Sequence, residues 1–212
     1  MIVFTIFHIK ISVSIPFIGI YTLMLYVDKT GLMLPTATAI ILHEAGHIIG
    51  LGIFKCKPEK INLRIGAVGI SGRFWLNSKQ EIIMLFMGPF FNILLFICIF
   101  SVFTVLKQVF CLKLAFVMLV VGIFNLLPII GLDGGDILKI ILTGRIKNKT
   151  VNHILYLVSI ITIFVIVVCG FFVLLDTKSN ISLILMGIYL LFGILLSKKQ
   201  KNYCKLQRNI VK

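Results

Sequence analysis

The sequence predicts an all-α polytopic membrane protein with about six transmembrane helices and a small cytoplasmic β element. Three observations support this fold class. Of the 212 residues, 59% are hydrophobic and 13% are charged, against about 45–50% and about 25% in soluble domains. Long apolar segments recur along the chain, and most basic residues gather between them. This pattern excludes a disordered chain, a secreted disulfide scaffold and a nucleic-acid-binding domain as the class of the whole protein.

Six apolar segments approach or reach the length needed to cross a hydrocarbon core about 30 Å thick. The first is the shortest, and a tilt into a neighbouring helix would accommodate it. We expect the spans at residues 15–27, 32–54, 81–106, 114–132, 151–175 and 181–197. Together they predict one six-helix membrane domain over residues 1–197, followed by a basic tail over residues 198–212.

The distribution of positive charge predicts which loops face the cytoplasm. Of the 21 Lys and Arg residues, one precedes the first span, six lie in loop 55–80, four follow the fourth span and six lie in the tail. Positive residues accumulate on the cytoplasmic side of a membrane protein. Both termini are therefore expected in the cytoplasm, for a protein of a bacterial cytoplasmic membrane. We expect the tail to bind anionic lipid and not nucleic acid.

Two segments on the predicted cytoplasmic side alternate apolar and polar residues with the period of a β-strand. They are residues 7–15 and 61–65, with residues 70–76 as a return strand of a hairpin. Two interpretations stay open for these strands. They form a small sheet that caps the helices, or their exposed edges pair with an extended substrate.

The second span contains the pattern His43-Glu44-Ala-Gly-His47. On a helix, residues four apart share a face, so both imidazoles can bind one zinc ion while Glu44 acts as a general base. Ionisable residues inside an apolar span are costly and mark a functional site. At 1.5 Å per residue, the two histidines lie about 10–16 Å from the expected cytoplasmic end of the span. The sequence therefore predicts a metal site within the membrane, nearer the cytoplasm.

A catalytic zinc site usually has three protein ligands and one open position. Two acidic residues, Asp133 and Asp136, combine the cytoplasmic side with a membrane segment that Pro128 and Gly131 interrupt. The other acidic residues outside the motif lie on the opposite side, in a loop or at the start of a span. Residue chemistry leaves both aspartates open as the third ligand, with capping of a helix as the alternative role.

Taken together, these motifs resemble the site-2 protease family of intramembrane zinc metalloproteases, peptidase family M50. The resemblance covers about two-thirds of the chain, and its patterns occur in the family's order. They are His43-Glu44-x-x-His47, Gly88-Pro89-x-x-Asn92 and Asn125-x-x-Pro128-x-x-x-Leu132-Asp133-Gly134-Gly135.

The resemblance implies a role for each central residue of these patterns. It implies His43, His47 and Asp133, instead of Asp136, as ligands of one zinc ion per chain, and Glu44 as the catalytic base. The implied enzyme is a zinc-dependent endopeptidase of regulated intramembrane proteolysis. It would cleave a peptide bond in or next to a transmembrane segment of a membrane-protein substrate, near the cytoplasmic face.

Two asparagines are further candidates for contact with the substrate or the transition state. The resemblance implies that Asn125 holds one of these near the metal. For Asn92, in the third span, hydrogen bonding between helices is the alternative.

The six-span layout and the N-terminal strand resemble one branch of the family, which includes the sporulation stage IV protease. That enzyme processes the membrane-associated precursor of a late sigma factor, so the resemblance implies a role in sporulation, and an inhibitory membrane partner is a further candidate. Members of the branch often carry a C-terminal nucleotide-sensing CBS domain. We expect none here, because 15 residues follow the sixth span.

Two other classes of protein also place metal-binding residues in a membrane. A metal transporter would normally show repeated halves with paired broken helices, and the sequence shows no repeat. A zinc-binding membrane regulator without proteolytic activity would keep the ligands. The Glu44→Gln variant separates these classes from a protease, because it should keep the metal and lose proteolysis.

Overall fold

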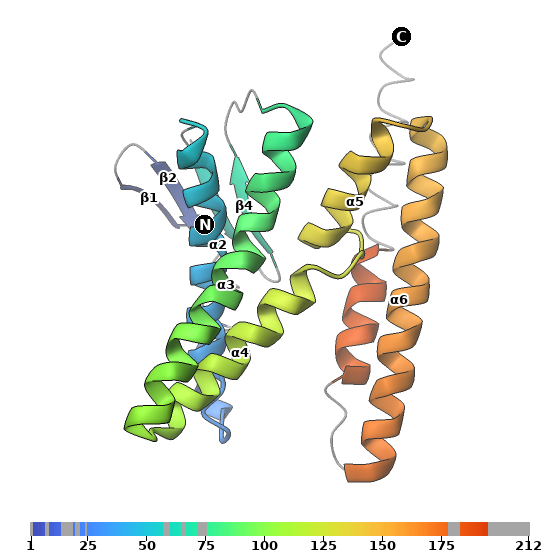
Figure 1. The fold of residues 1–212 in the computed structure, drawn as a ribbon. Helices are drawn as coiled ribbons and strands as arrows, with labels where there is room; N and C mark the ends of the chain where they lie inside the picture. Colours follow the sequence, from blue (N-terminus) through green and yellow to red (C-terminus); the bar gives the residue numbers. More distant parts are fainter. Residues whose placement is uncertain are drawn as a thin grey trace. The chain divides into compact units, whose positions relative to one another are not determined.

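A computed structural model describes residues 2–6, 9–13, 19, 22–23, 25–56, 60–64, 67–71, 76–177 and 183–194. The chain divides into two compact units, Met1–Leu126 and Leu127–Lys212, which are described separately below. Most of the described residues lie in helices (Figure 1). The predicted class, a helical membrane protein with a small β element, is confirmed.

Three mutually packed helices dominate the first unit: α2 (Met33–Ile53), α3 (Ser78–Leu106) and α4 (Val109–Asn125). Glycines let the helices approach closely, as is common between membrane helices. A Cβ on Gly46 of α2 would lie 2.6 Å from the Met87 carbonyl oxygen of α3, and one on Gly122 of α4 would lie 3.2 Å from the Pro89 carbonyl oxygen. These contacts place the middle of α3 against both neighbours.

Helix α3 begins with a capping box. The Asn77 side chain accepts a hydrogen bond from the Gln80 amide at 2.9 Å, and the Gln80 side chain accepts one from the Asn77 amide at 3.0 Å. Glu81 lies in the first turn, where an acidic side chain interacts favourably with the helix dipole. This position at the start of the helix accounts for the presence of Glu81, so no role in metal binding is needed to explain it.

A four-stranded sheet accompanies these helices, with strand order β1-β2-β3-β4. Neighbours β1–β2 and β3–β4 are antiparallel, whereas β2 and β3 are parallel. The strands are β1 (Ile2–Ile6), β2 (Ile9–Val13), β3 (Lys60–Arg64) and β4 (Ala67–Ser71). Strands β2 and β3 confirm the two alternating segments, although residues 7–8, 14–15 and 65 of the prediction lie outside the described part.

The sheet order corrects one expectation about its edges. The segments predicted to offer exposed edges are the two central strands, which pair with each other from Lys10↔Lys60 to Val13↔Leu63. The edges belong instead to β1 and β4. Strand β1 was not predicted, and β4 begins three residues before the expected return strand at residue 70. Any edge-pairing partner must therefore add to β1 or β4.

The second unit contains α5 (Asp133–Thr143), α6 (Asn148–Thr177) and a helix over Leu183–Ile194. Helix α5 packs on α6. A Cβ on Gly170 of α6 would lie 2.9 Å from the Leu183 side chain, which shows how closely the last helix approaches. Buried apolar side chains form the core of this unit: Ile129, Val151, Leu155, Ile163, Leu190 and Ile194.

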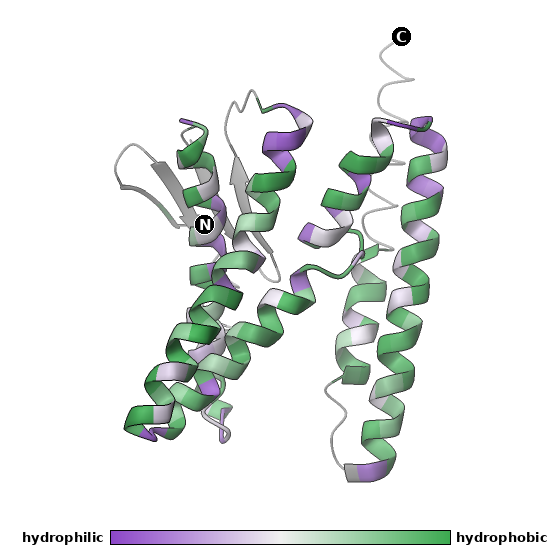
Figure 2. Ribbon diagram, viewed as in Figure 1, coloured by the Kyte–Doolittle hydropathy of each residue, from purple (hydrophilic) through white to green (hydrophobic). Residues whose placement is uncertain are grey.

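Among the described helices, α2, α3 and α6 are long and apolar enough to cross a membrane, and α4 and Leu183–Ile194 are shorter apolar helices. Many of their large apolar side chains are exposed, as lipid-facing residues are. Figure 2 shows hydrophilic residues gathered at the ends of α3 and α6. The predicted fourth span, 114–132, is shortened, because α4 ends at Asn125 ahead of Pro128. The first and sixth predicted spans lie partly outside the described residues.

Candidate metal centre

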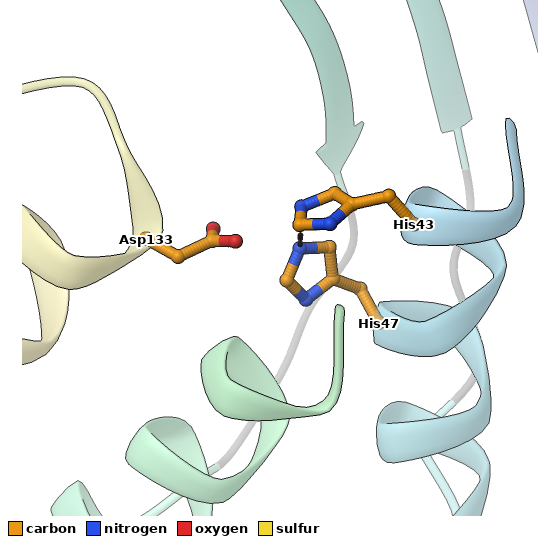
Figure 3. A group of neighbouring side chains, drawn as sticks. All are labelled: His43, His47 and Asp133. Atoms are coloured by element: carbon orange, nitrogen blue, oxygen red, sulfur yellow. Dashed lines mark hydrogen bonds between the residues drawn. The ribbon is translucent and has the colours of Figure 1, made fainter. Parts of the chain in front are cut away.

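His43 and His47 lie on successive turns of α2 and converge on one point. Their Nε2 atoms are 3.2 Å apart, and the rings are perpendicular with centroids 4.8 Å apart (Figure 3). Both side chains are buried, with 4% and 6% of their surface exposed. Two nitrogens that bind one tetrahedral zinc at about 2.0–2.1 Å are about 3.3–3.4 Å apart. The histidine pair therefore fits a chelating pair of metal ligands.

A main-chain carbonyl of α3 orients His47. The Nδ1 atom of His47 lies 3.0 Å from the carbonyl oxygen of Met84. Because a carbonyl oxygen only accepts, Nδ1 must carry the proton, and the neutral ring then keeps its Nε2 lone pair for a cation. Metal-binding histidines usually have such a second partner, which sets both tautomer and ring orientation. No sequence signal identifies Met84, because every residue has this carbonyl group.

Gly88 of α3 lies directly against the two imidazole rings. A Cβ at this position would lie 2.5 Å from Cε1 and Nε2 of His47 and 2.9 Å from Cε1 of His43. Only glycine leaves room for the rings in this arrangement. Gly88 is the first residue of the Gly88-Pro89-x-x-Asn92 pattern. The motif therefore included this glycine, but it did not predict that Gly88 packs against the histidine rings.

Glu44 lies on α2 between the histidines and is half-buried. Asn92, one turn after Gly88 on α3, is fully buried, with 0% of its surface exposed. Neither amide atom of Asn92 has a hydrogen-bond partner among the described residues. Within that part of the chain, the amide does not make the helix-to-helix hydrogen bond considered as an alternative. Its donor and acceptor remain available one turn from Gly88.

Asn125 is the last residue of α4. Its Nδ2 atom donates to the Val121 carbonyl oxygen at 2.9 Å, so one end of the amide is held by its own helix. This bond restricts the direction of the side chain, which is half-buried.

Asp133 belongs to the second unit, where it is the first residue of α5. It is half-buried, whereas Asp136, one turn later, is exposed. A Cβ on Gly135 would collide with the Ile129 carbonyl oxygen, so this glycine permits the first turn of α5 to pack against the preceding residues. Between the two aspartates that residue chemistry left open, burial favours Asp133. Both acids also interact favourably with the N-terminal end of the helix dipole.

The fold and the histidine pair define a helical membrane protein with a metallopeptidase motif. The model of peptidase family M50 matches residues 107–166, which include Asn125 and Asp133. The site-2 protease from Methanocaldococcus jannaschii has the same fold, with a TM-score of 0.66 and 24% sequence identity over 91% of this chain and 92% of that chain. A comparison with curated proteins finds no match. The match to the family model supports the resemblance predicted from the motifs over residues 107–166, and the structural match shows a shared fold.

Proposed function

We propose that this chain is an intramembrane zinc protease, which cleaves a peptide bond in or next to a transmembrane segment of a membrane-protein substrate. The observation that carries this proposal is the buried histidine pair. Its Nε2 atoms converge to 3.2 Å on a helix apolar enough to span a membrane, and the Met84 carbonyl fixes the ring of His47. Such a pair of polar side chains is costly among apolar residues unless it serves a site.

The proposed ligands of one zinc ion are His43, His47 and Asp133, the side chains drawn in Figure 3. Each offers one ligand atom of a type that zinc binds, two ring nitrogens and one carboxylate oxygen. Zinc bound by this set supplies a Lewis acid that polarises the scissile carbonyl and lowers the pKa of water. A set of three protein ligands leaves a position open for the reaction.

Glu44 is the proposed general base. It takes a proton from the attacking water and passes it to the nitrogen of the leaving amine, so the carboxylate returns to its charged form after each cycle. Its place between the two histidines on α2 supports this role, because the glutamate of the pattern H-E-x-x-H would serve as the base for a zinc ion held by those histidines.

Asn92 and Asn125 are the proposed contacts to the substrate or the transition state. Burial of the Asn92 amide without a partner among the described residues supports a role in binding a polar group of the substrate. One N–H of the Asn125 amide is bonded to the Val121 carbonyl, which leaves the second N–H and the carbonyl oxygen as the proposed contacts.

The proposed setting is a bacterial cytoplasmic membrane, with both termini in the cytoplasm and cleavage near that face. The motif pattern and the predicted six-span layout support a membrane-associated sigma-factor precursor as substrate during sporulation, with an inhibitory membrane partner. The basic tail, which lies outside the described residues, is proposed to bind anionic lipid because it carries six positive charges.

The test is cleavage of membrane-protein substrates by purified protein in detergent, with zinc content measured for each variant. Glu44→Gln should keep zinc and lose proteolysis, whereas Asp133→Asn should lose both. Asp136→Asn is the matched control, because it changes an exposed aspartate in the same helical turn. Zinc binding by the wild type without cleavage of any substrate would favour a membrane regulator over a protease.

A further inference from the structure

The segment that leads into Asp133 is irregular, and within it the side chain of Ile129 is buried while Gly131 is exposed. The Ile129 amide donates to the Leu127 carbonyl at 2.7 Å, and the Leu132 amide donates to the Ile129 carbonyl at 3.0 Å. Gly131 adopts the left-handed region with φ +96°, which favours glycine. Main-chain groups at membrane depth need partners because lipid offers none. The hydrogen-bond partner of the Ile130 amide therefore helps to fix the position of this segment.

That partner is Ser159 of α6. The Ile130 amide donates to Ser159 Oγ at 3.0 Å, across 29 residues of sequence. The hydroxyl donates in turn to the Leu155 carbonyl at 2.7 Å, one turn back in its own helix. A longer contact of 3.5 Å joins the same hydroxyl to the Pro128 carbonyl, and the lone pairs of Oγ accept from the segment before Asp133. Ser159 is fully buried, so water does not compete for this bond.

The position of the Ile130 amide is coupled to the start of α5. The side chain of Ile129 is fully buried, and its carbonyl group packs against Gly135 with no room for a Cβ. The start of α5, which carries Asp133, is thus in direct contact with Ile129, the neighbour of Ile130. A shift at Ile130 would disturb this contact.

We propose that Ser159 is a positioning residue for the third metal ligand. Ser159 fixes the turn before Asp133 by accepting a hydrogen bond from the Ile130 amide. It is not proposed to contact the metal or the substrate itself. This inference rests on the proposed function, because it requires that Asp133 binds zinc. Without the hydroxyl, the partly buried Ile130 amide would lose this hydrogen-bond partner, which would destabilise the turn.

The test compares Ser159→Ala with Thr162→Val, which also removes one hydroxyl from α6. The Thr162 hydroxyl donates to the Val158 carbonyl at 2.9 Å within the helix, so it reproduces the local bond of Ser159 without the bond to the turn. Zinc affinity is measured by chelator competition, and amide exchange is measured for peptides covering residues 127–135. Ser159→Thr keeps the hydroxyl and serves as the rescue variant.

Ser159→Ala should weaken zinc binding about 10-fold, which is typical for loss of a group that orients a ligand. Exchange should rise in peptides covering 127–135 and remain unchanged in α6. Thr162→Val should stay within about twofold of the wild type, and Ser159→Thr should recover most of the loss. Equal behaviour of Ser159→Ala and Thr162→Val would overturn the inference, as would faster exchange throughout the second unit. Wild-type zinc affinity in Asp133→Asn would instead overturn the proposed ligand set.

Discussion

His47 on α2 donates from Nδ1 to the main-chain carbonyl of Met84 on α3 at 3.0 Å. This single contact links the metal-binding motif to a second helix. It decides which ring nitrogen carries the proton, and it holds the other nitrogen toward His43. The close approach of α3 that makes the contact depends on glycine at position 88, where the rings fill the space of a side chain.

Gly88→Ala is therefore expected to disrupt the metal centre. The added methyl group would lie 2.5 Å from two atoms of the His47 ring, and either the ring or helix α3 must move. Overpacking of this kind costs about 1–3 kcal/mol, and a displaced ring would weaken zinc binding by about 10-fold or more. Zinc titration and thermal unfolding of the purified variant measure the two effects.

Gly52→Ala is the matched control for this substitution. Gly52 also lies in a helix of the first unit, and a Cβ there would meet no atom within 4 Å. The control should bind zinc as the wild type does and unfold at the same or a higher temperature, because alanine favours helix over glycine. Normal zinc binding by Gly88→Ala would contradict the packing account.

The proposed reaction also predicts a preference among substrates. A helical transmembrane segment hides its carbonyl groups in hydrogen bonds, so it must unwind before a carbonyl can reach the metal. Single-span substrates with Gly or Pro near the cleavage site should be cleaved faster than matched segments of uninterrupted leucine. Initial cleavage rates of such pairs measure the preference, and equal rates would rule out local unwinding as a requirement.

The edge-pairing interpretation now concerns β1 and β4, since these strands form the edges of the sheet. Main-chain amides of an edge strand point alternately toward the neighbouring strand and toward the open edge. Of two single proline substitutions in β4, at Val68 and at Gly69, one should therefore remove an outward-facing amide, which the sheet tolerates. If substrate adds to this edge, that variant should cleave more slowly while its unfolding temperature is unchanged. The same pair of substitutions in β1, at Val3 and Phe4, tests the opposite edge.

A decrease confined to one edge would identify the docking strand. If all four proline variants that remain folded cleave at the wild-type rate, substrate does not pair with the sheet. A central-strand proline at Asn62 provides the comparison for damage to the sheet itself, because it removes an amide from a strand with neighbours on both sides.

Asp28 stabilises the start of α2 through its carboxylate. Oδ2 accepts from the Met33 amide at 2.9 Å, and Oδ1 accepts from the Thr30 hydroxyl at 2.6 Å and from the Thr30 and Gly31 amides. The Thr30 hydroxyl makes the largest contribution and the Met33 amide the next, and together they lower the pKa of Asp28 from 3.8 to about 2. These bonds favour the charged form in the folded state.

The stabilisation by Asp28 should accordingly depend on pH. A carboxyl group with a lowered folded-state pKa stabilises the protein above its unfolded pKa and loses this contribution as pH falls through the folded value. Wild type should unfold at a higher temperature than Asp28→Asn at neutral pH. The difference should shrink as pH falls from about 4 to about 2. A difference that stays constant over this range would exclude the charge as its cause.

Local periodicity explains how much of the site was predictable. His43, Glu44 and His47 belong to one short stretch, and helix geometry alone places the two histidines on one face. The aspartates near Pro128 were recognisable because acidic residues are rare in this chain. An interruption of the fourth span at Pro128 and Gly131 was predicted, whereas the end of α4 at Asn125, ahead of the proline, was not. The sequence did not predict strand β1, because its residues Ile2–Ile6 are almost all apolar and show no clear alternation.

The sequence by itself determined the membrane class, the helical layout and the histidine pair, because composition and residue spacing act over a few neighbouring residues. The tertiary structure decided which groups of other helices bond to these residues. Met84 is 37 residues from His47, and Ser159 is 29 residues from Ile130. The first bond uses a main-chain carbonyl, which every residue has, and the second uses a main-chain amide, which every residue but proline has. Only the packing of the helices therefore selects which residue takes part.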